Sequence, residues 1–352
     1  MLTFLVYNSI LLLSALFSYT AEHSKTKRSR IISRITLFNI LFIPAAIRYG
    51  IGTDFFTYQD IFYSQDDNIE PIYLLINKLV YTLNLNVQWV FIITAIITYI
   101  PLCFLLKKKN FFIIITLYIV IYYLNTYNTI RQAMAISFII CGVNQLIYGH
   151  KRKYLFFTII ASFCHLSSII AIPFAFIYKI KINNTLLLSA IILLFAFSKM
   201  NIIEILANSN LFTDSRYGYY LATDFIEEAN MGSGLGFLSK IIIPLLLIIL
   251  KFKFKSSDTE YSVIYYFSIA YVLLYILGIQ IFIFTRVAAV FIFAPIFSTI
   301  VLLKLFSPNN RMWIFSIIFL MYWLVFQKTI IDGSILNSGG LGINPYTTIF
   351  DA

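Results

Sequence analysis

The chain has 352 residues, of which 60% are hydrophobic and only 12% are charged, whereas about a quarter of the residues in a soluble domain are charged. This composition excludes an ordinary soluble protein, and the apolar runs are too continuous for the alternating pattern of an outer-membrane barrel. The formal net charge of +11 would suggest a nucleic acid partner for a soluble protein. In a membrane protein an excess of Lys and Arg indicates instead which loops face the cytoplasm, so no nucleic acid partner is expected.

The apolar runs predict an all-α, polytopic membrane bundle. A spanning helix needs roughly 20 residues, and the chain has room for about ten to twelve crossings. In chain order, the expected spans are 2–20, 31–47, 88–106, 111–124, 132–148, 182–199, 237–250, 261–283, 287–305 and 312–330.

Two apolar segments depart from this pattern. The stretch 71–85 is interrupted by Asn77 and Lys78, so we expect it to lie at the outer interface of the membrane. The stretch 154–178 has basic clusters at both ends, which one crossing cannot keep on the same side. We therefore expect a re-entrant pair of half-helices that meet near His165, where irregular backbone needs cover from protein or a wet cavity.

Basic clusters between the apolar runs set the predicted orientation, because cytoplasmic loops are enriched in Lys and Arg. These clusters lie at 25–34, 107–109, 151–153, 179–181, 251–255 and 304–311. The same rule places both termini outside, and the first span lacks the basic leader of a cleaved signal peptide. We expect one transmembrane domain, 1–352, with external loops 48–87 and 201–236 and an external tail 331–352.

Seven polar side chains are expected at the outer face, on segments far apart in the sequence. They are Arg48, Asp54, Arg131, His165, Arg216, Arg286 and Tyr346. Several guanidinium groups around one wet pocket favour an anionic substrate such as a pyrophosphate, whose oxygens they bind in paired hydrogen bonds. No carboxylate cluster with divalent-metal spacing accompanies them. We therefore predict no metal and no cofactor, with compensating charge supplied by the arginines.

Other interpretations of these residues remain open. Arg48 closes an apolar run, as a snorkelling arginine would. Arg286 stands within a long apolar run, where a cation normally faces a bundle interior, but it could pair with a structural acid. The imidazole of His165 suits proton transfer near neutrality, or it could simply hold the turn between the half-helices.

The order of several short motifs resembles the EpsG family, which groups with the Wzy-type polymerases of O-antigens and exopolysaccharides. The resembling residues are Arg48 with Gly52-Thr53-Asp54, Arg131-Gln132, Cys164-His165-Leu166-Ser167, Ser215-Arg216, Arg286 and Asn344-Pro345-Tyr346. The resemblance implies a helical bundle similar to the lipid-linked glycosyltransferases of GT-C type. It also implies a multi-pass protein of the bacterial inner membrane, with its active site facing the periplasm.

The implied reaction transfers a growing glycan from undecaprenyl pyrophosphate to the next lipid-linked oligosaccharide repeat unit. On this hypothesis Arg48, Arg131, Arg216, Arg286 and Tyr346 bind the substrate, His165 is the base and Asp54 orients an arginine. The lipid-linked oligosaccharide, the bilayer, a chain-length regulator and a flippase are the implied partners. Two alternatives stay open: a flippase or transporter of lipid-linked oligosaccharides, and an O-antigen ligase. The collection of arginines at one face favours one-sided chemistry over transport.

Overall fold

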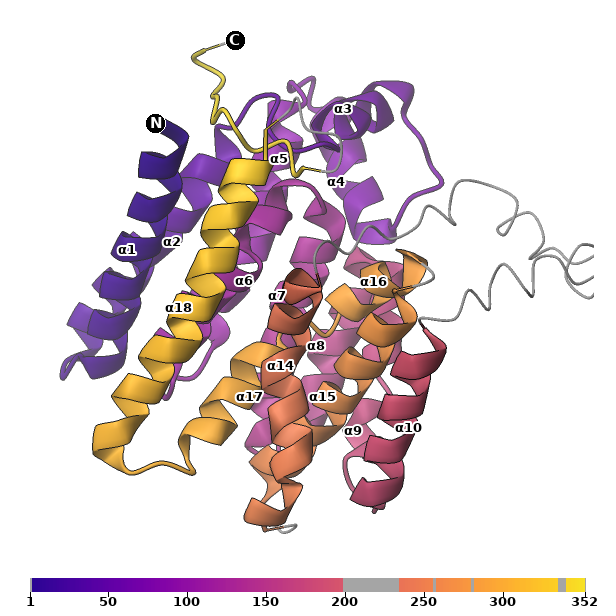
Figure 1. Ribbon diagram of the computed structural model, residues 1–352. Coiled ribbons are helices and arrows are strands. Elements are labelled where there is room, and N and C mark those ends of the chain that lie inside the picture. Colours follow the sequence, from indigo (N-terminus) through magenta and orange to yellow (C-terminus); the bar gives the residue numbers. More distant parts are fainter. Residues whose placement is uncertain (1, 199–233, 256–257, 280–281, 335–339, 352) are drawn as a thin grey trace, which may run out of the picture. The chain divides into compact units, whose positions relative to one another are not determined.

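The computed structural model describes residues 2–198, 234–255, 258–279, 282–334 and 340–351 (Figure 1). These residues form helices, with two isolated β-bridges and no named strand. Seven helices within these described ranges are long and apolar enough to cross a membrane, which confirms the polytopic all-α class. They are α1 (Leu2–His23), α2 (Lys27–Ala46), α5 with η1 (Gln88–Leu105), α7 (Ile130–Ile147), α14 with η5 (Leu235–Lys253), α15 (Thr259–Leu277) and α18 (Pro308–Asp332).

Three of the ten expected spans form shorter helices. They are α6 (Phe111–Ile121), α10 (Asn184–Phe197) and α17 (Ala294–Leu303). A proline explains the late start of α17: Pro295 lies in its first turn, where a missing N–H does no harm. The preceding residues form a separate helix, α16 (Phe282–Ala289), so the run 287–305 is divided.

The expected reversal near His165 is present. Helix α8 (Lys151–Cys164) ends there, and His165 is extended, with φ −156° and ψ 120°. The short helix η3 (Leu166–Ala171) then returns along α8. Its last residue, Ala171, lies beside the start of α8, where the Tyr154 hydroxyl donates a hydrogen bond to the Ala171 carbonyl. His165 therefore lies at the tip of a hairpin, and a further short helix, α9 (Phe174–Ile177), follows.

The segment 48–87 carries two short helices, α3 (Phe55–Ser64) and α4 (Pro71–Thr82). Helix α4 has only 12 residues and is not among the helices long enough to span a membrane. Its first position is Pro71, so the preceding Glu70 occupies the N-cap. Lys78 pairs with Asp67 at 2.8 Å in the exposed part of this segment.

The chain divides into two compact units, 1–172 with 313–352 and 173–312. In the first unit the tail returns to the start of α1: the backbone N–H of Tyr346 donates to Thr3 Oγ1 at 3.0 Å, and Tyr7 donates to the carbonyl of Ile343 at 3.1 Å. The two chain ends of this unit therefore lie together, at its upper end in Figure 1.

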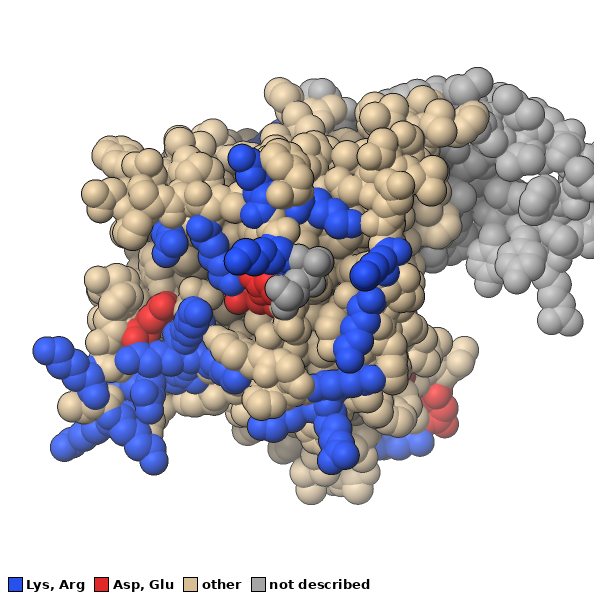
Figure 2. All heavy atoms as spheres, turned by 90° about the horizontal axis from the view of Figure 1, so that it is seen from below, with Lys and Arg blue, Asp and Glu red and all other residues tan. Residues whose placement is uncertain are grey.

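Basic loops gather at the lower end of the first unit. Glu22, at the end of α1, accepts hydrogen bonds from the backbone N–H groups of Asn110 and Phe112, and Lys108 donates to the carbonyl of Ser24. These contacts bring the clusters at 25–34 and 107–109 together. Figure 2 views the chain from below and shows many Lys and Arg side chains and few acidic ones.

Candidate functional site

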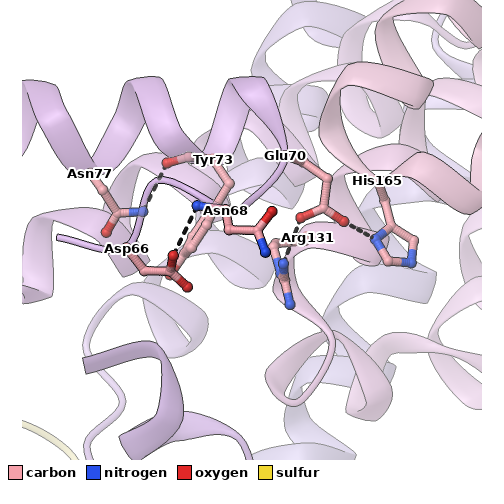
Figure 3. A network of polar contacts seen from close by, with 7 residues as sticks. All are labelled: Asp66, Asn68, Glu70, Tyr73, Asn77, Arg131 and His165. Atoms are coloured by element: carbon pink, nitrogen blue, oxygen red, sulfur yellow. Dashed lines mark hydrogen bonds and ion pairs between the residues drawn. The ribbon is translucent and has the colours of Figure 1, made fainter. Parts of the chain in front are cut away.

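One carboxylate of the first unit joins two of the expected site residues (Figure 3). Glu70 Oε2 accepts a hydrogen bond from Arg131 Nη1 at 2.5 Å, and Glu70 Oε1 lies 2.6 Å from His165 Nδ1. The three residues come from three elements: the N-cap of α4, the first turn of α7 and the residue that ends α8. We call Glu70, Arg131 and His165 the Glu70 cluster.

The Glu70 cluster is partly sheltered from solvent. The Glu70 side chain is 13% exposed, whereas those of Arg131 and His165 are 28% and 27% exposed. Burial by itself would raise the pKa of Glu70, but the hydrogen bond with His165 and the charge of Arg131 lower it to about 2. The carboxylate is therefore ionised near neutral pH, while the side chains of Arg131 and His165 remain partly exposed to solvent.

Close packing of α7 against α8 positions Arg131 and His165. At Gly142 in α7, a Cβ atom would meet Phe157 Cβ at 3.2 Å and the backbone oxygen of Tyr154 at 3.4 Å. A side chain at this position would crowd α8, so glycine favours the close approach of the two helices. The start of α7 and the end of α8 meet at the same end of this helix pair.

Aromatic side chains form a wall around Arg131. Its guanidinium carbon lies 5.9 Å from the ring centre of Tyr58 and 5.8 Å from that of Tyr73. Burial raises the pKa of Tyr58 to about 12, although the charge of Arg131 acts to lower it. Tyr58 therefore remains neutral and supplies a hydroxyl group and a π-face beside the cation.

Arg48 lies in a neighbouring buried group of the same unit. Only 2% of it is exposed, and its guanidinium carbon lies 4.9 Å from the Tyr127 ring centre and 5.1 Å from that of Phe91. Its Nε has no hydrogen-bond partner within the described part of the chain. A small cavity beside it is lined by both apolar and hydroxyl-bearing residues, Thr94 and Tyr99 among the latter.

Asp54 precedes α3 and lies near Tyr58, whose pKa its charge acts to raise. Its carboxylate accepts a hydrogen bond from Thr53 Oγ1 at 3.3 Å, and it forms no ion pair with the described residues. The nearby Gly52 has φ +99°, and a Cβ atom there would meet the carbonyl of Tyr127 at 2.6 Å. The glycine motif thus provides a close backbone approach, whereas the carboxylate that holds an arginine in this unit is that of Glu70.

Tyr346 connects the tail to α2. Its hydroxyl donates to the carbonyl of Pro44 at 2.9 Å, and its ring packs edge-on against Tyr7. Arg48 and Thr348 pair in an isolated antiparallel bridge, so the tail covers the backbone that carries Arg48.

The two remaining expected site residues are not among the described residues of the first unit. Arg216 is outside the described residues. Arg286 is an exposed residue of α16 in the second unit. The first unit thus contains five of the seven expected residues. Arg131 and His165 belong to the Glu70 cluster, and Arg48 and Tyr346 belong to the neighbouring group. Asp54 lies near Tyr58, whose pKa the charges of both Arg48 and Arg131 act to lower.

The sequence reasoning did not select Glu70. It belongs to an acidic stretch with Asp66 and Asp67, and nothing in that stretch sets it apart by composition. The usable signal was its position directly before Pro71, which starts α4 and fixes Glu70 as the N-cap. Its partners are 61 and 95 residues away, so the contact itself cannot be read from local patterns.

The arrangement can bind an anion and accept a proton. Arg131 has five N–H donors, and Glu70 receives only one of them through Nη1. The imidazole of His165 contacts Glu70 through Nδ1, which leaves Nε2 directed elsewhere. Within the described residues, no group of three or more His, Cys, Asp or Glu side chains could hold a metal ion.

No curated protein and no solved structure matched the chain. A family match covers residues 31–348, which include the Glu70 cluster, Arg48 and Tyr346. That match extends over nearly the whole sequence, and the chain is a member of the EpsG family.

Proposed function

We propose that the protein is a polymerase of polyprenyl-pyrophosphate-linked oligosaccharide repeat units. Membership of the EpsG family supports a polysaccharide polymerase-like role. The observation that carries the proposal is the meeting of Arg131 and His165 on Glu70, because a cation and a proton acceptor in one cluster are what this glycan transfer needs.

In the proposed reaction, an acceptor sugar hydroxyl attacks the anomeric carbon of the growing glycan. The new C–O bond forms as the bond from that carbon to the pyrophosphate breaks, and the electron pair leaves with the pyrophosphate. The hydroxyl proton passes to His165. Arg131 stabilises the charge that develops on the leaving pyrophosphate, and removal of one such preorganised donor typically costs about 10²–10³ in rate.

The distribution of charge supports a site on the outer face of the bacterial inner membrane. The basic loops gather at the lower end of the first unit, and such loops favour the cytoplasm. The tail and Arg48 lie at the opposite end of the unit (Figure 1). The start of α7 lies there too, because Gly52 donates to the carbonyl of Gly342 in the tail and Thr53 donates its backbone N–H to Asn128 just before α7. Lipid-linked repeat units displayed on the outer leaflet would therefore reach Arg131 and His165.

The test supplies purified, reconstituted protein with lipid-linked repeat units and resolves the products by size. The native protein should build a ladder of chain lengths without another acceptor. Arg131→Ala and His165→Ala should each leave single-repeat products at normal protein levels. The matched controls are Arg152→Ala and His150→Ala, which change exposed residues of the basic cluster at the start of α8 and should keep the ladder.

Normal ladders from both site variants would contradict the assignment of these residues. A native protein that forms no ladder, but moves the lipid-linked unit between leaflets, would support the flippase instead. A product that forms only when a lipid A core acceptor is added would support the ligase.

A further inference from the structure

Glu70 and His165 form a carboxylate–imidazole pair whose proton position follows from the contacts. An ionised carboxylate accepts hydrogen bonds and donates none, and Glu70 already receives one from Arg131. The 2.6 Å contact between Glu70 Oε1 and His165 Nδ1 therefore requires a proton on Nδ1. In the neutral imidazole, Nε2 then carries the lone pair.

The surroundings of His165 leave that lone pair available. Nε2 has no hydrogen-bond partner among the described residues, and the side chain is 27% exposed. The backbone also restrains the ring: the N–H of His165 donates to the carbonyl of Ala161 at 2.9 Å, which closes α8. The imidazole is thus held at the tip of the hairpin with its proton-accepting nitrogen free.

We propose that Glu70 is the positioning residue of the site, which fixes His165 in the tautomer protonated on Nδ1 so that Nε2 accepts the proton of the acceptor hydroxyl. This inference rests on the proposed function for its kinetic part. In the step, the hydroxyl O–H bond breaks as its oxygen bonds to the anomeric carbon, and the proton moves to Nε2. The Glu70 carboxylate stabilises the resulting imidazolium without itself accepting the proton.

The second oxygen of Glu70 gives the same residue a second task. Since Oε2 holds Arg131 while Oε1 holds His165, one carboxylate sets the distance between the cation that faces the leaving group and the base. Without the Glu70 carboxylate, the Arg131 side chain would populate several rotamers. Positioning of this kind affects the chemical step more than it affects binding.

The decisive variant is Glu70→Gln, which keeps the shape of the side chain and removes its charge. Its amide can donate to Nδ1 and would then favour the opposite tautomer, with the proton on Nε2. We expect kcat to fall by about 10²–10⁴-fold, the range that general-base catalysis supplies. The KM for the lipid-linked donor should not rise, because Arg131 keeps its charge. Glu70→Asp keeps the charge and should retain more activity than Glu70→Gln.

Two controls separate a positioning role from a structural one. Asp67→Asn removes an exposed carboxylate three positions away, whose partner is Lys78, and should leave kcat unchanged. In a His165→Ala background, Glu70→Gln should lower the residual rate by a smaller factor than it does in the native protein, because only the contact with Arg131 is then left to lose. Equal losses in both backgrounds would overturn the inference, as would a raised KM with normal kcat or a faster Glu70→Gln enzyme.

A spectroscopic measurement separates this inference from the proposed function. The chain has three histidines, so ¹⁵N-histidine NMR of the reconstituted protein, with His165→Ala for assignment, reports the tautomer of His165 directly. We expect protonated Nδ1 in the native protein and protonated Nε2 in Glu70→Gln. A native Nε2–H tautomer would overturn the inference even in an active polymerase. If the expected tautomers are found but the native protein forms no ladder, the proposed function is refuted, whereas the inferred pairing of Glu70 with His165 still holds.

Discussion

Single residues of the site differ in how visible they are in the sequence. Arg131 and His165 stand out because charged or titratable side chains are rare in apolar segments and costly there. Glu70 does not stand out, since acids are common in an exposed loop. We expected Asp54 to orient an arginine, because the neighbouring glycines allow a close approach. In the structure, the carboxylate that contacts an arginine is that of Glu70, which pairs with Arg131. Local composition can thus identify an unusual residue but not its long-range partner.

The lowered pKa of Glu70 predicts a pH-dependent contribution to stability. The pKa falls from an ordinary value of 4.5 to about 2 through contacts with His165 and Arg131. The stabilisation is therefore fully present above about pH 4.5 and disappears as the pH falls toward about 2. The melting temperature of the reconstituted native protein should drop across this window more steeply than that of Glu70→Gln.

The charged and titratable groups near Glu70 are Arg131, His165 and the thiol of Cys164, whose pKa burial and the charge of Glu70 raise. Other carboxylates titrate in both proteins, so the difference between the two curves isolates Glu70. Parallel curves for the native protein and the variant would show that the Glu70 contacts add no stability.

At the scale of elements, the sequence predicted helices better than it predicted their ends. Every expected span coincides with a helix because long apolar runs leave the backbone no other partner in lipid. The turn at His165 was also predictable, since basic clusters on both sides required a reversal. The division of 287–305 depends on Pro295, and the docking of the tail depends on individual hydrogen bonds, such as that from Tyr346 to Pro44. Hydrophobicity alone reports neither feature.

The contact between α7 and α8 yields a prediction at this scale. Gly142→Leu should force the two helices apart, because even a Cβ atom there would be only 3.2 Å from Phe157 Cβ. Overpacking of this kind typically costs about 1–3 kcal/mol. We expect a lower melting temperature and, since Arg131 and His165 lie on these helices, a lower polymerisation rate in the ladder assay.

The matched control for this change is Gly236→Leu in α14, where a Cβ atom would meet nothing within 4 Å. It should leave both the melting temperature and the rate near their native values. If Gly142→Leu were as well tolerated as Gly236→Leu, the close approach of α7 and α8 would not position the site.

At the scale of the whole molecule, function depends on which end of the first unit faces outward. Three hydrogen bonds tie the basic clusters to the end formed by Glu22, Ser24 and Asn110. The tail, the start of α1 and Arg48 share the other end. The positive-inside bias then predicts that the segment leading to Glu70 is extracytoplasmic, which polymerisation on the outer leaflet requires.

Thiol labelling tests this orientation, because the native cysteines Cys103, Cys141 and Cys164 are buried and should react little. Asp67→Cys places a thiol three residues before Glu70, at a position whose side chain is 73% exposed. A membrane-impermeant maleimide should label this variant in intact spheroplasts, whereas Lys109→Cys, in an exposed basic loop, should react only after the membrane is opened. The reverse pattern would place Glu70 in the cytosol, where polymerisation on the outer leaflet is impossible, whatever the chemistry of Arg131 and His165.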